Sequence, residues 1–257
     1  MKVLVSLFIS TMLFVTVSFG QTNGKGKVYV SKTLEYLHLL SDSTLWASIG
    51  EEHDTTKYHI TGDTLFIQNE YWQTGANHKT DHIIKWQDYK IIKNDSDTLF
   101  LLNTFKGYSK PFNWEDTLKF VSLVKLKETV AKFKYLKLDY SNPFDGTLKL
   151  TIDSSGKVNY ERTPEIISGG NVLTRIKGEL TKREFANFLD TLAYSLPSRL
   201  ARQRSCGIDG AMTNFEIAFN DKIIISKGCS LKWTHAFLFN YLYDIGRNKG
   251  FVKRQRG

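Results

Sequence analysis

Cysteine is scarce in this chain of 257 residues, which has two, Cys206 and Cys229. Neither lies directly after the apolar run at the start of the sequence, where a lipoprotein carries its lipid-modified cysteine. A lipid-anchored bacterial lipoprotein is therefore disfavoured. After residue 17, no run approaches the ~20 apolar residues that a helix needs to span a bilayer. We therefore expect no membrane span and a soluble mature protein.

The short motifs of common catalysts are also missing. The sequence has no Walker loop, no dinucleotide-binding fingerprint after a predicted strand and no H-E-x-x-H zinc motif. Residues 205–210 are typical of a tight turn rather than of a nucleophile elbow. The carboxylates of the second half form no recognisable catalytic pair. These absences favour a non-catalytic protein.

The first twenty residues have the pattern of a secretory signal peptide. Lys2 gives a positive start, residues 3–17 are almost entirely apolar, and Ser18-Phe19-Gly20 supplies small residues for cleavage. We expect cleavage after Gly20 and an exported protein, periplasmic or secreted.

The formal net charge is +9, and much of the excess lies near residues 199–204 and in the tail at 247–256. For an exported chain this favours an anionic envelope surface, an acidic glycan or an acidic protein as partner, rather than nucleic acid. The alternative is a solvated surface with a basic tail.

An even number of cysteines in an exported chain favours a disulfide, here Cys206 with Cys229. Closing a loop of this length stabilises a fold by roughly 3 kcal/mol in the chain-entropy model. The alternative is a catalytic thiol paired with His235, for which neither cysteine has a recognisable motif.

The pattern of the first half predicts an antiparallel β domain over residues 21–130. Asp-Thr-Leu recurs after Gly, Asn or Asp turns, as at Asp63 and Asp97, and each copy begins a new apolar-aromatic run. We predict a meander that forms an antiparallel sheet or a partial barrel, with strands near 57–61, 64–69, 82–93, 98–104 and 118–127.

The pattern of the second half, residues 131–257, predicts an α+β domain with a basic C-terminal tail. Leu148, Leu150 and Ile152 alternate as in a half-buried strand. Thr181 and Glu184 form a capping box before a helical apolar stripe that ends at Pro197. A last helix over 231–245 completes the predicted order β-β-β-α-β-β-α. A short junction near 128–136 joins this domain to the first one.

Histidines of the first domain are candidate metal ligands: His53, His59, His78 and His82. Zinc needs about three converging nitrogen or oxygen ligands, usually supported by nearby carboxylates. A zinc-dependent hydrolase is therefore an alternative function. The other interpretation is that these are surface and loop histidines. We predict no cofactor, with zinc as the alternative.

The same domain is rich in aromatic residues, and a barrel could present them to a sugar or a small apolar ligand. The candidate ligand-binding residues are Tyr71, Trp72, Trp86 and Trp114. The alternative is that these aromatic side chains fill the core of the β domain.

The leader, the Gly-Asp-Thr-Leu turns and the stretch 146–160 together resemble exported Bacteroidota-type proteins. In those proteins a lipocalin-like β domain precedes a small α+β domain of unknown function, which commonly carries a Cys-Pro pair where this chain has Asn142-Pro143. The resemblance implies O-glycosylation at Asp-Thr sites, here Thr64, Thr98 and Thr117. It implies no catalytic residue.

The combined interpretation is an exported, non-catalytic binding or envelope-associated protein. The alternatives are a metal-dependent hydrolase that uses the histidines and an inhibitor-like protein that recognises an acidic partner.

Overall fold

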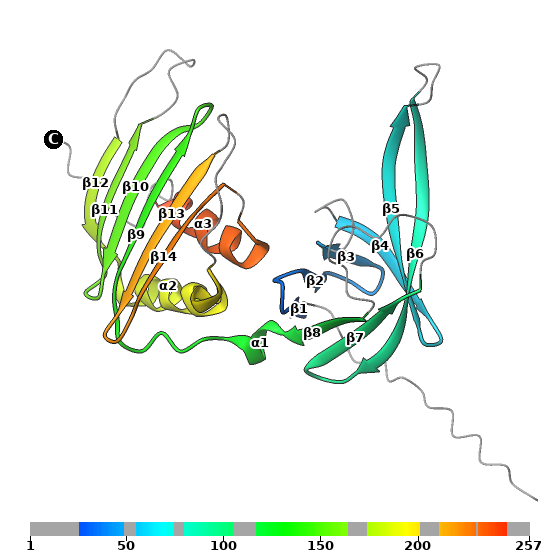
Figure 1. Ribbon diagram of the computed structural model, residues 1–257. Coiled ribbons are helices and arrows are strands. Elements are labelled where there is room, and N and C mark those ends of the chain that lie inside the picture. Colours follow the sequence, from blue (N-terminus) through cyan, green and yellow to red (C-terminus); the bar gives the residue numbers. More distant parts are fainter. Residues whose placement is uncertain are drawn as a thin grey trace, which may run out of the picture.

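The computed structural model describes residues 26–48, 55–74, 80–104, 117–163, 174–200, 211–229 and 231–245. Within these residues the chain is mostly antiparallel β structure, arranged as a closed barrel and a six-stranded sheet (Figure 1).

The barrel consists of eight strands joined in sequence order. They are β1 (Val28–Ser31), β2 (Tyr36–Leu39), β3 (Thr44–Ala47), β4 (Thr55–Thr61), β5 (Thr64–Thr74), β6 (Thr80–Asn94), β7 (Thr98–Asn103) and β8 (Thr117–Ser122). The barrel closes because β1 pairs with β8, with Val30 opposite Val121. The predicted antiparallel β domain is confirmed in this form.

The barrel interior is filled by side chains that alternate inward along the strands. The buried set is Tyr29, Leu37, Leu45, Ala47, Tyr58, Leu65, Ile67, Tyr89, Ile91, Leu99, Leu101 and Phe120. The Tyr58 hydroxyl donates to the carbonyl of Ser41 at 2.9 Å. The Tyr89 hydroxyl has no hydrogen-bond partner among the described residues, and burial raises the pKa of Tyr89.

The turn before β7 shows why aspartate recurs in this half. Asp95 Oδ1 accepts hydrogen bonds from the backbone amides of Asp97 at 2.9 Å and Thr98 at 2.7 Å. Lys93 Nζ lies 2.9 Å from Asp95 Oδ2. These hydrogen bonds, led by that from Lys93, hold the pKa of Asp95 below its usual range. The side chain therefore fixes the turn by bonding the local backbone.

The six-stranded sheet has the order β12-β11-β10-β9-β13-β14. Its strands are β9 (Phe133–Asn142), β10 (Gly146–Asp153), β11 (Lys157–Thr163), β12 (Thr174–Glu179), β13 (Met212–Phe219) and β14 (Ile223–Gly228). Four strands thus precede helix α2, one more than predicted. The additional strand is β9, whose alternation begins inside the segment interpreted as a junction.

Two helices, α2 (Lys182–Tyr194) and α3 (Trp233–Ile245), cover one face of this sheet on the side toward the barrel (Figure 1). The capping box is confirmed: the Thr181 side chain accepts from the Glu184 amide, and Glu184 accepts from the Thr181 amide at 2.7 Å. Leu148, Leu150 and Ile152 are buried beneath the helices, as their alternation predicts.

The β10–β11 turn requires glycine at one position. Gly156 has φ +85°, a conformation that other residues rarely adopt. A Cβ atom there would also contact the Phe185 ring at 3.5 Å. The contact distance is ordinary, so the left-handed backbone rather than the packing of α2 selects glycine.

One sequence prediction at an element end is wrong. Strand β8 ends at Ser122, and the short helix α1 (Leu123–Leu126) replaces the rest of the strand predicted over 118–127. In helix α3, Phe237 is 51% exposed. No described helix has the length and hydropathy to cross a membrane.

The barrel and the helices of the sheet meet at an aromatic junction. The Trp233 ring of α3 stacks on Tyr36 of β2, with 4.7 Å between centroids, and contacts Trp46 of β3 edge-on at 6.0 Å. Lys232 Nζ lies 2.8 Å from Glu35 Oε1 beside this stack. Apolar packing and one ion pair therefore join the two β structures.

Behind the junction, His235 of α3 is 3% exposed. Its Nε2 atom has no partner among the described residues. Burial lowers the pKa of His235 to about 4, against the raising effect of a hydrogen bond to the backbone of Leu196. Leu196 itself is fully buried and has φ 54°. The junction therefore holds a neutral histidine.

Candidate functional site

Strands β5 and β6 extend beyond the barrel as a two-stranded arm. Strand β4 pairs with β5 as far as Ile67, and β6 pairs with β7 from Tyr89 onward. Among the described strands, residues 68–74 and 80–86 pair only with each other. Figure 1 shows this hairpin projecting from the barrel. We call these residues the arm.

One side of the arm carries exposed apolar side chains, because alternate residues of a strand point the same way. Trp72 is 70% exposed, Ile84 is 53% exposed and Trp86 is 42% exposed. Cross-strand pairing places them in successive rows of one face. We define the arm face, with its base on β4 and β5, as His59, Phe66, Gln68, Glu70, Trp72, His82, Ile84 and Trp86.

At the base of the arm face, His59 positions Trp86. The imidazole of His59 stacks on Phe66, with centroids 4.7 Å apart and planes at 12°. The Trp86 ring then contacts His59 edge-on, with centroids 4.8 Å apart. The exposed indole therefore packs against an imidazole that is itself stacked on Phe66.

Towards the tip, His82 positions Trp72 in a similar way. The two rings stack with centroids 4.7 Å apart, and they are direct cross-strand partners. His82 Nε2 lies 3.2 Å from Glu70 Oε2, and Gln68 Nε2 donates to Glu70 Oε1. A chain of polar contacts thus runs from the buried Gln68 to His82, whose ring stacks on the exposed indole.

The two tryptophans lie four residues apart along the arm. Gln68 is opposite Trp86 and Trp72 is opposite His82. At about 3.3 Å per residue, the two indoles are roughly 13 Å apart along the strands. Between them lie the Glu70 carboxylate and the Ile84 side chain. The arm face can therefore contact an elongated ligand with two aromatic platforms and a fixed carboxylate.

The two described histidines of the predicted metal site, His59 and His82, lie far apart. His59 lies opposite Phe66 and His82 lies opposite Trp72, so six residues, about 20 Å, separate their rows. His53 and His78 lie outside the described residues. In the part of the chain that the structure describes, no group of three or more His, Cys, Asp or Glu could hold a metal ion.

The residues predicted to bind a ligand have mixed outcomes. Trp72 and Trp86 point to solvent and do not fill the core, contrary to the alternative that aromatics of this domain are buried. Tyr71 lies on β5, where its side chain is not described, and Trp114 lies outside the described residues. A small apolar ligand inside the barrel is disfavoured, because apolar side chains fill that space.

The remaining predicted sites lie away from the arm face. Cys229 follows β14 and Cys206 lies outside the described residues, so their disulfide stays a prediction. Thr64 and Thr117 begin β5 and β8 and are half-buried. The Thr98 hydroxyl is buried. A glycan on Thr98 would therefore require the turn to open.

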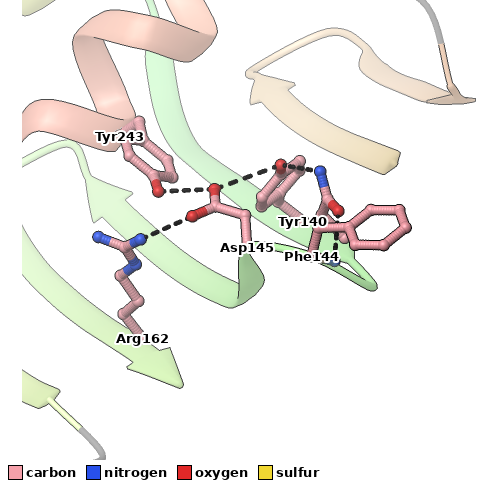
Figure 2. Close-up of polar contacts among 6 residues, drawn as sticks. Tyr140, Phe144, Asp145, Arg162 and Tyr243 are labelled. Carbon is pink, nitrogen blue, oxygen red and sulfur yellow. Dashed lines mark hydrogen bonds and ion pairs between the residues drawn. The ribbon is translucent and has the colours of Figure 1, made fainter. Parts of the chain in front are cut away.

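A second polar cluster lies at the end of the six-stranded sheet (Figure 2). Asp145, in the β9–β10 turn, accepts from Arg162 Nη2 at 2.9 Å and from the Tyr243 hydroxyl at 2.7 Å. The Arg162 guanidinium lies 4.8 Å from the centre of the Tyr243 ring. Tyr140 completes the cluster, 3.5 Å from Asp145 Oδ2.

Both carboxylate oxygens of Asp145 are occupied by partners within the protein. These partners come from β9, β11 and α3, so the cluster ties the end of α3 to the sheet (Figure 2). We assign it a structural role, and the arm face remains the candidate functional site.

Sequence reasoning identified four residues of the arm face but assigned them to two different sites. His59 and His82 were predicted as metal ligands, whereas Trp72 and Trp86 were predicted to bind a ligand. Phe66, Gln68, Glu70 and Ile84 were missed. The alternation of Gln68, Glu70 and Trp72 along one strand is the signal that could have grouped them.

No protein-family model, curated protein or solved structure matches this chain.

Proposed function

We propose that this protein is an exported, non-catalytic binding protein that binds a neutral oligosaccharide chain on the arm face. The observation that carries the proposal is the exposure of Trp72 and Trp86 on one face of a projecting hairpin. Export rests on the signal-peptide pattern of residues 1–20.

The chemistry of the arm face suits a sugar chain. The flat faces of indole rings stack on the C–H faces of sugar rings, and nearby polar groups bond the hydroxyls. Glu70 supplies a carboxylate held by Gln68 and His82. Ile84 extends the apolar surface between the two tryptophans.

The arrangement also favours an elongated ligand over a small one. The arm is a projecting ribbon, and its exposed tryptophans are roughly 13 Å apart by strand geometry. A ligand that contacts both must extend along the hairpin. A chain of several sugars meets this requirement, whereas a single sugar contacts one indole.

The test measures binding of cellohexaose, chitohexaose and mannohexaose by tryptophan fluorescence and by calorimetry. We expect at least one hexaose to bind, and Trp72→Ala and Trp86→Ala each to weaken its affinity by about tenfold, the equivalent of one lost aromatic contact of ~1.4 kcal/mol.

The matched control is Phe144→Ala, which removes another exposed aromatic ring, 66% exposed, from a turn of the six-stranded sheet. Its affinity should equal that of the wild type. Absence of binding to all three hexaoses, or equal affinity of the wild type and the Trp72→Ala/Trp86→Ala variant, would overturn the proposal.

A further inference from the structure

The outward face of the six-stranded sheet carries a hollow of about 410 Å³ over β10, β11 and β12. This is the face opposite the helices. The outward side chains that line it are Lys149, Thr151, Asn159, Glu161, Arg175 and Lys177.

The strand register explains why a hollow forms here. Thr151 lies opposite Asn159, and Asn159 lies opposite Lys177. The neighbouring row carries the longer side chains of Lys149, Glu161 and Arg175. Two short polar side chains lie among longer ones, so they form a floor below the surrounding surface.

Positive charge exceeds negative charge in this hollow. Glu161 is its one carboxylate, and Arg175 Nε lies 3.1 Å from Glu161 Oε2, so this pair is neutral. Lys149 and Lys177 form no ion pair with any described residue. Two uncompensated ammonium groups therefore border the same depression.

The hydrogen-bonding groups of the hollow are mainly donors. The two ammonium groups can only donate, and the Thr151 hydroxyl and the Asn159 amide can donate from the floor. Charge-assisted bonds from lysine to an anionic oxygen are stronger than bonds between neutral groups. The donor set and the charge together select an anionic oxygen ligand.

We propose that this hollow binds a carboxylate or sulfate group on a sugar unit of an acidic polysaccharide. Its volume lies within the ~300–1,000 Å³ of typical ligand sites. The site goes beyond the proposed function, because it uses a different sheet, different residues and charge rather than aromatic stacking. The two proposals can therefore fail separately.

The test compares binding of the protein to polygalacturonate, which carries carboxylates, to dextran sulfate and to uncharged dextran. The variant is Lys149→Gln/Lys177→Gln. The matched control is Lys157→Gln/Lys227→Gln, which removes two exposed lysines from the same face outside the hollow. Both variants lose the same net charge, so they differ only in where the charge is lost.

We expect at least one acidic polymer to bind, uncharged dextran not to bind, and the hollow variant to bind about tenfold more weakly. That factor corresponds to two exposed charge contacts. The control variant should lose less than about threefold, which reflects long-range attraction alone.

Three results would overturn the proposal: no binding of either acidic polymer, equal binding of uncharged dextran, or equal loss of affinity in the two variants. A preference for polygalacturonate would identify the bound group as a carboxylate, and a preference for dextran sulfate would identify it as a sulfate. The neutral hexaoses and the tryptophan variants do not enter this test.

Discussion

The barrel and the six-stranded sheet are both antiparallel, but they bury their apolar side chains in different ways. The barrel closes on itself through β1 and β8, so its own strands enclose the core. The sheet remains open and depends on α2 and α3 to cover its apolar face. Because the barrel core is enclosed by its own strands, the exterior needs no covering helices, and the arm projects from it.

The same comparison separates two kinds of exposed surface. Over β10, β11 and β12, the outward face of the sheet carries rows of charged and small polar side chains, such as Arg175, Glu161 and Lys149. The arm face carries two exposed tryptophans and an isoleucine. Large exposed apolar groups gathered on one face mark contact sites more often than an alternating row of charges does. This is why the two surfaces are assigned different ligands.

The largest predicted loss of stability comes from a substitution in the core between the sheet and its helices. Phe188 of α2 is fully buried and lies 5.4 Å, centroid to centroid, from Phe133 of β9. Phe188→Ala should lower the free energy of unfolding by about 3–5 kcal/mol, because it removes buried apolar surface and leaves a cavity. Urea unfolding measures the change.

The control for that experiment is Phe237→Ala on α3, the same chemical change at a side chain that is 51% exposed. Its effect should stay within about 0.5 kcal/mol. Equal effects at the two positions would mean that the helices do not cover the sheet as described.

A second prediction concerns pH and the junction between the two structures. Well above pH 6.5, His235 is neutral in both folded and unfolded chains, so it contributes no pH dependence. As the pH falls from about 6.5 to about 4, the unfolded chain takes up a proton that the folded chain resists. Stability should therefore fall by about 3 kcal/mol over this range, at ~1.4 kcal/mol per unit.

His235→Asn keeps a side-chain donor for the Leu196 backbone and removes the titration. Its free energy of unfolding, measured from pH 7.5 to 4, should show a much shallower slope than that of the wild type. Burial also lowers the pKa of His38, which acts in the same direction in both proteins. Identical slopes in the two proteins would show that His235 is not buried.

The smallest predicted effect sharpens the description of the barrel core. The Tyr89 hydroxyl is buried without a hydrogen-bond partner among the described residues. Tyr89→Phe removes an unsatisfied polar group and little volume, so the free energy of unfolding should stay unchanged or rise by up to about 1 kcal/mol. A loss above 1 kcal/mol in thermal or urea unfolding would show that the hydroxyl has a partner.

The parts of the fold that were predicted correctly are governed by neighbours in sequence. The capping box at Thr181 and Glu184 forms because a side chain and an amide three residues apart meet at a helix start. Burial of Leu148, Leu150 and Ile152 follows from the two-residue period of a strand. Both patterns are complete within a few residues.

The errors have different origins. Strand β9 was missed although Leu136, Leu138 and Tyr140 alternate within its own sequence, because it begins inside the segment interpreted as a junction. Other outcomes depend on distant segments: Ile60 has the strand parity of the buried Tyr58 but is 52% exposed, because inward parity gives burial only where other strands enclose the position. The candidate site was split for a related reason: cross-strand partners such as Trp72 and His82 are ten residues apart in sequence.

The sequence by itself determined the antiparallel β character of the first half, the turn chemistry of its aspartates and the helix start at Thr181. These properties depend on local hydrogen bonds and side-chain periodicity. Tertiary structure alone decided that β1 closes the barrel against β8, that His235 is buried and that the two tryptophans share one exposed face. Those outcomes depend on which distant strands and helices pack together, because burial is a property of the assembled fold rather than of any single segment.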